Sequence, residues 1–180
     1  MKRSLVFLPL VILMAFTLSC QDQQALAELG KMKAQAEVEE QNKALVKGLF
    51  DGLNNKNDEI IGELCAPDYV WYFPSNDPKP LSREEELEFV KLVWAGFPDI
   101  NWSIEEIVAA DDKVLTRFIA TGTHQGKFQG IPATGNKIES SGIAIHRLVN
   151  GKIVEAREEA DLLGMMSQLG MELRPAAVEE

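Results

Sequence analysis

The stretch FQGIPATGNKIESSGIAIHRLVNGKIVEA, residues 128–156, contains the pattern that decides the fold. Asn150 and Gly151 stand between two β-type segments, 137–149 and 152–162. An Asn-Gly pair in this position is the strongest local signal for a tight hairpin, because both turn residues need positive φ. We therefore predict two antiparallel strands that are joined by this turn.

The rest of the domain predicts helices first and strands afterwards. Apolar residues at helical spacing predict a helix from residue 42 and a second helix at 59–64. Ser82 and Glu85 form a capping box that opens a third helix. Further strands are predicted at 69–73, 102–109 and 113–124, and a short closing helix at 165–170. This order is typical of an α+β fold, and we expect a conical barrel of a curved antiparallel sheet with three N-terminal helices packed on one face.

The N-terminus has the features of an export signal. Lys2 and Arg3 precede an apolar run that is too short to span a membrane comfortably and that fits a secretory signal. Ser19 and Cys20 follow, as in a bacterial lipoprotein signal, in which the cysteine is lipidated. An ordinary cleaved signal or an uncleaved anchor would be the alternatives.

This interpretation divides the chain into four parts. We expect a lipoprotein signal peptide at 1–19, a tether at 20–41 after the lipidated Cys20, the folded domain at 42–172 and a loose tail at 173–180. The protein would be lipid-anchored in the cell membrane or outer membrane, facing the periplasm or the outside.

Charge and cysteine content narrow the classes of partner. The chain has 18 basic and 28 acidic residues, and this surface would repel nucleic acid. We therefore expect no nucleic-acid partner, and attachment to the membrane through acyl chains only. With Cys20 assigned to lipid, Cys65 is alone, and we expect a small buried apolar side chain without a disulfide.

Several segments together resemble the SnoaL-like polyketide cyclase family, often called ester cyclases, of the nuclear-transport-factor-two-like superfamily. They are NKALVKGLFDGLNN, CAPDYV, the run from FPDINWS to NGKIVEA, and LLGMMSQLG, within residues 42–170. The resemblance implies a cone whose mouth opens to a hydrophobic pocket for a small ligand. It also implies ring closure by intramolecular aldol condensation, with an acid/base carboxylate and no cofactor, and a homodimer.

The resemblance selects Glu158 as the acid/base residue. The family places a His and then an Asp just after the GKIVE run, and this chain has Ala156 and Glu158 there. Strand alternation puts Ala156, Glu158 and Ala160 on one face. That face could line the cavity, or this end of the strand could be solvated.

Three further side chains are candidates, each with a structural alternative. Tyr72 stands where many family members have a His; it could donate to an oxyanion or line an apolar wall. His146 could be a catalytic base or a buried wall residue. Arg117 could bind an anionic group of the substrate or pair with Glu139 or Glu158.

Aromatic residues complete the predicted pocket. We expect Trp94, Phe97 and Phe118 to contact the substrate, together with Arg117. His124 and His146 lie apart and without a spaced carboxylate cluster, so we predict no metal site. Gly126, Gly130 and Gly135 would shape the rim of the cone, since they lack the strand–loop–helix context of a phosphate site.

Two functions remain open from the sequence. One is an extracytoplasmic cyclase or isomerase that acts on a small carbonyl compound. The other is a non-catalytic module that binds a small apolar ligand or forms a dimer. The two hypotheses differ in the position of Glu158, which should be desolvated and point inward in the enzyme.

Overall fold

The computed structural model describes residues 7–172 and 174, and the side chains from residue 22 onward. The chain divides into two compact units, Met1–Val38 and Glu39–Glu180. One helix, α1 (Phe7–Asn54), runs without interruption through the predicted tether and the predicted first helix. The Cys20 side chain and the tail positions 173 and 175–180 lie outside the described residues. Among those described, no helix is both long enough and apolar enough to cross a membrane.

The second unit contains the elements that the sequence predicts, with shifted ends. After α1 come the helix α2 (Ile60–Leu64) and the strands β1 (Cys65–Tyr72) and β2 (Leu81–Ser82). They are followed by α3 (Arg83–Gly96), β3 (Asn101–Ala110), β4 (Lys113–Thr123), β5 (Lys137–Val149), β6 (Lys152–Ala160) and α4 (Leu162–Gln168). The short edge strand β2 was not predicted.

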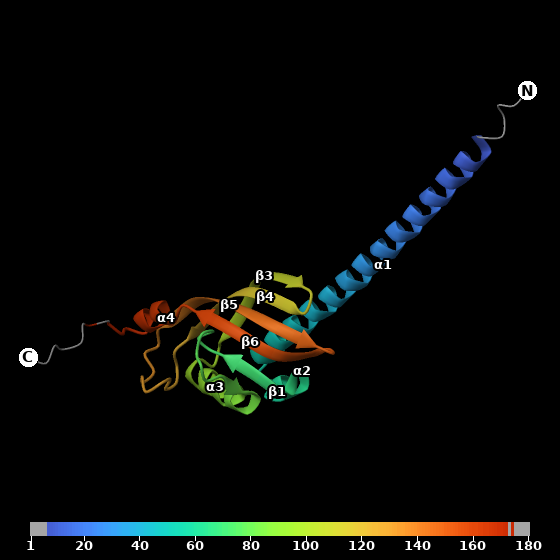
Figure 1. The fold of residues 1–180 in the computed structure, drawn as a ribbon. Helices are drawn as coiled ribbons and strands as arrows, with labels where there is room; N and C mark the ends of the chain where they lie inside the picture. Colours follow the sequence, from blue (N-terminus) through green and yellow to red (C-terminus); the bar gives the residue numbers. More distant parts are fainter. Residues whose placement is uncertain (1–6, 173, 175–180) are drawn as a thin grey trace, which may run out of the picture. The chain divides into compact units, whose positions relative to one another are not determined.

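The strands form one curved sheet in the order β2-β1-β6-β5-β4-β3 (Figure 1). The α+β class is therefore confirmed. The prediction of a wholly antiparallel sheet is wrong, because β1 pairs with β6 in parallel, with Trp71 opposite Ala156. Local turn signals report only neighbouring strands, and this pair is formed by segments far apart in the sequence.

The predicted hairpin is confirmed. Asn150 and Gly151 have φ values of 51° and 72°, as a two-residue turn of this type requires. Val149 pairs with Lys152 on either side of the turn. The register shifts by one residue between Leu148, which pairs with Ile153, and Arg147, which pairs with Glu155. Beyond this bulge Ala144 lies opposite Glu158.

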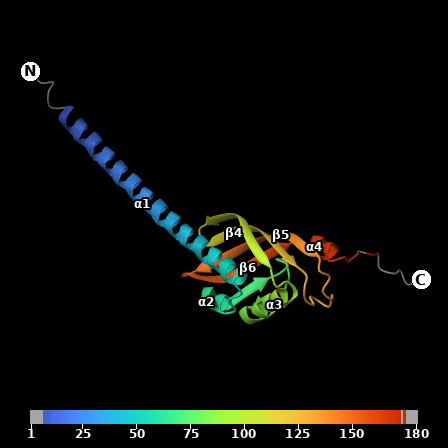
Figure 2. The ribbon, with the colours of Figure 1, turned by 180° about the vertical axis from the view of Figure 1, so that it is seen from behind.

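Helices α2 and α3 lie on one face of the sheet, beside β1 (Figures 1 and 2). The capping box of α3 is present: the Ser82 hydroxyl accepts from the Glu85 backbone N–H, and Glu85 accepts from the Ser82 N–H. A box of this kind fixes the first turn of the helix and thereby its rotation about its axis. This rotation decides which α3 side chains enter the interior.

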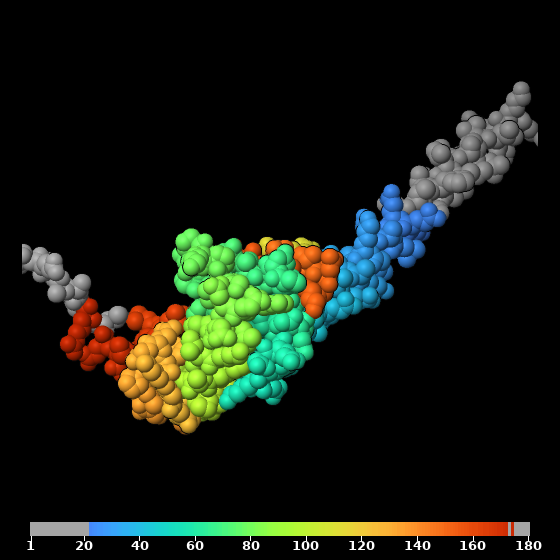
Figure 3. Space-filling model, turned by 90° about the horizontal axis from the view of Figure 1, so that it is seen from below, coloured from blue at the N-terminus to red at the C-terminus, as the bar shows by residue number. Residues whose placement is uncertain are grey.

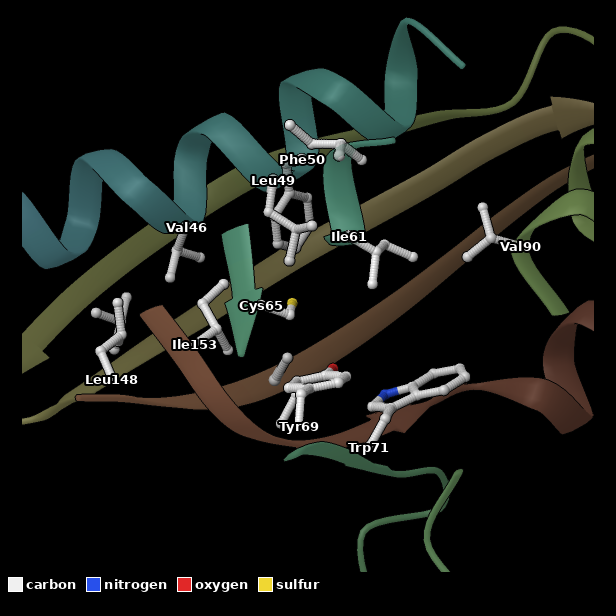
Figure 4. Close-up of a cluster of buried hydrophobic side chains, with 14 of the residues drawn as sticks. Val46, Leu49, Phe50, Ile61, Cys65, Tyr69, Trp71, Val90, Leu148 and Ile153 are labelled. Carbon is white, nitrogen blue, oxygen red and sulfur yellow. The ribbon is translucent and has the colours of Figure 1, made fainter. Parts of the chain in front are cut away.

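Two apolar clusters fill the space between the helices and the sheet. The larger cluster joins α1, α2, α3 and the strands, and Figure 4 shows Val46, Leu49 and Phe50 of α1 above Tyr69 and Trp71 of β1. The smaller cluster contains Phe97, Phe128 and Met165 among its members. The predicted burial of Cys65 is confirmed, with 1% of the residue exposed.

The loop between β4 and β5, residues 124–136, lies beside α3, as Figure 3 shows in orange and yellow-green. The backbone N–H groups of Gln125 and Gly126 both donate to the Gly96 carbonyl. A Cβ at Gly126 would lie 2.0 Å from the Ala95 carbonyl oxygen, so only glycine fits this close approach. The loop therefore closes against the C-terminal end of α3.

Candidate active site

The interior contains a cavity of about 110 Å³, here called the main cavity. Its walls come from α1, α3, α4, the sheet and the loop 124–136. Aromatic rings dominate the walls: Trp71, Phe73, Phe89, Phe97, Trp102, Phe118 and Phe128. A smaller cavity of about 40 Å³ shares six wall residues with it, including Trp71, Phe118, Glu86 and Glu158.

Glu158 lines both cavities, from β6. The residue as a whole is partly exposed. Because its side chain lines the cavities, it lies on the inner face of the sheet and not on the outer face. Burial raises the pKa of Glu158 from 4.5 to about 8; the charge of Glu86 raises it further and the indole of Trp71 lowers it. A carboxyl with this pKa is present in both protonation states near neutral pH and can take and give a proton.

Glu86 is a second carboxyl in the same two cavities, and the sequence analysis did not select it. It projects from α3, only 7% of the residue is exposed, and its Oε2 has no hydrogen-bond partner in the described part of the chain. Burial raises the pKa of Glu86 to about 7, and the nearby phenol of Tyr69 lowers it. Buried carboxyls without a cationic partner are rare and point to a function.

The alternation of β1 brings Tyr69, Trp71 and Phe73 to the inner face. Trp71 and Phe73 stack with their ring centroids 5.0 Å apart, and both rings line the main cavity. The Tyr69 ring lies beside Trp71 in Figure 4 and is buried. Burial and the charge of Glu86 raise the pKa of Tyr69, so the phenol stays protonated. Its hydroxyl makes no hydrogen bond of good geometry, although it is close enough to Glu86 to affect its pKa.

His146, on β5, is the third ionisable residue that lines one of the two cavities. The residue is buried and lines the smaller cavity, with its ring 6.3 Å from the ring of Phe50. Burial lowers the pKa of His146 to about 4, and a hydrogen bond to the Val114 backbone opposes this effect. The imidazole is therefore neutral near pH 7, and its Nδ1 has no hydrogen-bond partner among the described residues.

Tyr72 and Arg117, which the sequence placed in the pocket, do not line either cavity. Tyr72 is on the opposite face of β1 from Trp71, where the Arg157 guanidinium lies 3.8 Å from its ring centroid. Arg117 pairs with Glu106 on β3, with an Nε–Oε2 distance of 3.5 Å. The structural alternative for Arg117 is the one observed, with Glu106 in place of the expected Glu139 or Glu158.

The predicted aromatic residues divide in the same way. Phe97 and Phe118 line the main cavity and are almost completely buried. Trp94 does not line it; its indole N–H donates to the Leu53 carbonyl at 3.1 Å and ties α3 to α1. Trp94 therefore holds Leu53, a wall residue of the main cavity, without lining the cavity itself.

A periodic pattern could have revealed Glu86. It precedes Val90, Val93 and Phe97 at intervals of four, seven and eleven residues, and all four line the main cavity. These intervals return to one face of a helix. An acid at the start of an apolar stripe is the signal of an inward-facing carboxyl.

His124 and Cys65 are buried but do not line either cavity. The His124 Nδ1 accepts from the Thr134 backbone N–H at 3.3 Å, which holds the loop 124–136 and leaves His124 outside both cavities. Burial raises the pKa of the Cys65 thiol strongly, so it is not a reactive thiolate. Within the described part of the chain, no three His, Cys, Asp or Glu side chains converge as metal ligands would.

The chain is similar in sequence and fold to known polyketide cyclases and to a proposed hydroxylase. The chain is 43% identical over 134 residues to aklanonic acid methyl ester cyclase DnrD of Streptomyces peucetius, covering 70% of this chain and 88% of that one. Its fold is similar to IdmH of Streptomyces antibioticus, a proposed polyketide cyclase (TM-score 0.64, 33% identity, 72% and 99% of the two chains). It is also similar to AclR of Streptomyces galilaeus, a proposed hydroxylase (TM-score 0.68, 28% identity, 73% and 97%).

The family model of the SnoaL-like polyketide cyclases matches residues 43–169 of the chain. The matched segment contains the whole sheet, α3 and both cavity carboxyls. The protein therefore belongs to the SnoaL-like polyketide cyclase family.

Proposed function

We propose that this protein is an acid/base cyclase or isomerase that needs no cofactor and acts on a small, uncharged carbonyl compound. The observation that carries the proposal is Glu158, an ionisable carboxyl with a raised pKa in the wall of an aromatic cavity. Such a group can remove a proton next to a carbonyl group and return it after ring closure or bond migration.

The cavity supports a ligand without negative charge. Two carboxyls line it, and among the described residues no lysine or arginine does. An anionic ligand would meet like charges in a medium of low dielectric constant, which is strongly unfavourable. An ester or a ketone avoids this repulsion, in line with the methyl ester in the name of the relative DnrD.

The size of the cavity supports a small ligand. An apolar cavity of roughly 150 Å³ holds one benzene ring. The main cavity has about 110 Å³, which is less than this, so it holds at most about one small ring without movement of its walls. A larger ligand would have to extend past the walls or displace α4 or the loop 124–136.

Proton abstraction can be tested without knowledge of the natural substrate. Cyclohexanone in deuterated buffer exchanges its α-hydrogens, and NMR follows the loss of their signal. We expect the wild-type protein to accelerate this exchange and Glu158→Gln to reduce the acceleration by about 10²-fold or more. Glu105→Gln, at an exposed position of β3, is the matched control.

The same experiment separates an enzyme from a binding module. A wild-type protein that binds cyclohexanone but leaves the exchange at the buffer rate would be a non-catalytic binder. Equal acceleration by the wild type and by Glu158→Gln would remove Glu158 from the mechanism.

We also propose export and lipidation at Cys20. The support is the basic pair Lys2-Arg3, the apolar run and the small residue before Cys20. In a bacterial host fed an alkyne fatty acid, the wild type should incorporate the label and reach the membrane fraction, and Cys20→Ala should do neither. Labelling of Cys20→Ala equal to the wild type would contradict the proposal.

A homodimer through the outer face of the sheet is a further proposal. Val108, Leu115 and Ile145 pair in a row across β3, β4 and β5 and are 59, 37 and 41% exposed. An apolar row of this kind marks an interaction surface. Ile145→Glu should give monomers in sedimentation velocity. The control Leu92→Glu, at an exposed apolar position of α3, should remain a dimer. A wild type that is already monomeric would refute the dimer.

A further inference from the structure

Glu86 and Glu158 reach the same space from different elements. Glu86 comes from α3 on one side and Glu158 from β6 in the sheet, and each lines both the main and the smaller cavity. The two carboxyls are close enough for the charge of Glu86 to raise the pKa of Glu158. A ligand in the cavity would therefore contact both groups at once.

Among the described residues, no Lys or Arg lines the two cavities and compensates the charge of the pair. From β1, Tyr69 and Cys65 face Glu86, and burial keeps the phenol and the thiol protonated. From β5, His146 is neutral near pH 7. Within β6 the nearby charge is Glu159, which adds a further negative charge. Two carboxyls under these conditions are not both ionised near neutral pH, so one of them keeps its proton.

Apart from the two carboxyls, the described polar side chains of the main cavity can offer a hydrogen bond but cannot transfer a proton near neutral pH; they are the Trp71 and Trp102 indoles, the Gln129 amide and the Ser140 hydroxyl. The Ser140 hydroxyl donates to the Asp161 carbonyl at 3.1 Å, and the Trp71 indole interacts with Glu158. Tyr72 and Arg117 do not line the cavity. An aldol-type reaction needs a donor for the developing enolate oxygen as well as a base, because the negative charge would otherwise form in an apolar medium.

We propose that Glu86 is the second acid/base residue of the site. The two carboxyls share one proton, and in the form that reacts Glu86 holds it and protonates the carbonyl oxygen while the Glu158 carboxylate removes a proton from the neighbouring carbon. The pKa values of about 7 for Glu86 and about 8 for Glu158 make this form the less populated one, by about tenfold, and it is reached when the proton moves from Glu158 to Glu86. This inference rests on the proposed function. In the step, the C–H bond breaks and its proton goes to the Glu158 carboxylate. The electron pair forms the C=C bond of an enol, and the carbonyl oxygen takes the proton of the Glu86 carboxylic acid.

The two residues can then exchange roles as the reaction proceeds. The enol carbon attacks a second carbonyl group of the same molecule, and the new C–C bond closes the ring. Glu158 gives its proton to the new alkoxide oxygen, and Glu86 takes back the proton of the enol oxygen. Both carboxyls return to their initial states, so no oxidant, reductant or metal is consumed.

The first test measures the pair without a substrate. The carboxyl carbons of ¹³C-labelled glutamate are followed by NMR over a pH titration of the wild type, Glu86→Gln and the control Glu88→Gln, an exposed position of α3. We expect the titration midpoint of Glu158 to fall by about one pH unit in Glu86→Gln, because a neighbouring charge is removed. An unchanged midpoint would overturn the coupling on which the proposal rests.

The second test uses a ligand that mimics the enol. 4-Fluorophenol, with a single ring, has an aromatic hydroxyl that can donate to one carboxylate and accept from one carboxylic acid, and ¹⁹F NMR reports its binding. Affinity for the wild type should pass through a maximum with pH, since the pair then holds one proton. In Glu86→Gln the alkaline limb should disappear, because the amide remains a donor at every pH.

The two tests separate this inference from the proposed function. A wild type that does not exchange the hydrogens of cyclohexanone refutes the enzyme and thereby the catalytic role of Glu86, although the pair is still visible in the titration. A wild type that exchanges them, with Glu86→Gln equally active and its fluorophenol profile unchanged, refutes the role of Glu86 alone. A loss of about 10²-fold in exchange together with the loss of the alkaline limb supports it.

Discussion

Alkaline pH should destabilise the protein through Glu158, and Glu158→Gln should remove this effect. The carboxyl has a pKa of about 8 in the folded state and 4.5 as its ordinary value. Between these values the unfolded chain binds fewer protons than the folded chain. The free energy of unfolding therefore falls as the pH rises from about 4.5 to about 8, and below this window the carboxyl contributes no pH dependence.

The magnitude follows from the shift. One pKa unit corresponds to about 1.4 kcal/mol, so the shift from 4.5 to about 8 corresponds to a loss of about 5 kcal/mol above pH 8. The same reasoning gives about 3 kcal/mol for Glu86, whose pKa is about 7. These values are upper bounds, because water that enters the cavity would reduce them. They are large against the roughly 5–15 kcal/mol that stabilises a typical domain.

Urea unfolding followed by tryptophan fluorescence measures the effect, since Trp71 and Trp102 line the main cavity. The free energy of unfolding is compared at about pH 5 and about pH 9 for the wild type, Glu158→Gln and the control Glu105→Gln. We expect the difference between the wild type and Glu158→Gln to shift by several kcal/mol in favour of the variant between these two pH values. Parallel profiles for these two proteins would show that Glu158 is solvated, and the reasoning on the cavity would be refuted.

Three other substitutions test the fold around the site. Gly142→Ala would place a Cβ 2.3 Å from Phe118 Cζ, so we expect the free energy of unfolding in urea to fall by about 1–3 kcal/mol. Ligand binding should also weaken, because Phe118 lines both cavities. Ser82→Ala removes the capping box of α3 and should cost about 1 kcal/mol by the same assay. In the wild type the free energy of unfolding should fall as the pH falls from about 6.5 to about 4, because the unfolded chain gains a proton on His146 that the buried imidazole does not. His146→Leu should lessen this fall. The same fall in the variant and the wild type would contradict the burial of His146.

The fold follows from local patterns to a large extent. Asn150-Gly151 fixes the turn and the first pairs of β5 and β6, and beyond the bulge at Arg147 and Leu148 the alternation of β6 from Ala156 places Glu158 inward. The capping box at Ser82 fixes the start of α3. Each of these features depends on residues within a few positions of one another, which is why the sequence is sufficient to predict them.

The composition of the site depends on contacts that no local pattern specifies. Tyr72 was predicted inward, but the pairing of β1 with β6 has an irregularity between Cys65 and Val70, and Trp71 takes the inner face. Glu86 becomes a cavity residue only because α3 packs against β1 with its apolar stripe inward. The choice of face is made by tertiary packing in both cases, so the sequence predicted one carboxyl of the site and missed the other.

A purely structural role does not account for the two carboxyls. Burial of an acid without a cation costs free energy, and a glutamine or an aliphatic side chain in the same place would avoid this cost. The chain has exposed positions for its other acids, as Glu88 and Glu105 illustrate. Residues that lower the stability of the fold at their position are typical of functional sites. The position of Glu86 opposite Glu158, more than the aromatic walls, therefore favours proton transfer over simple binding in this cavity.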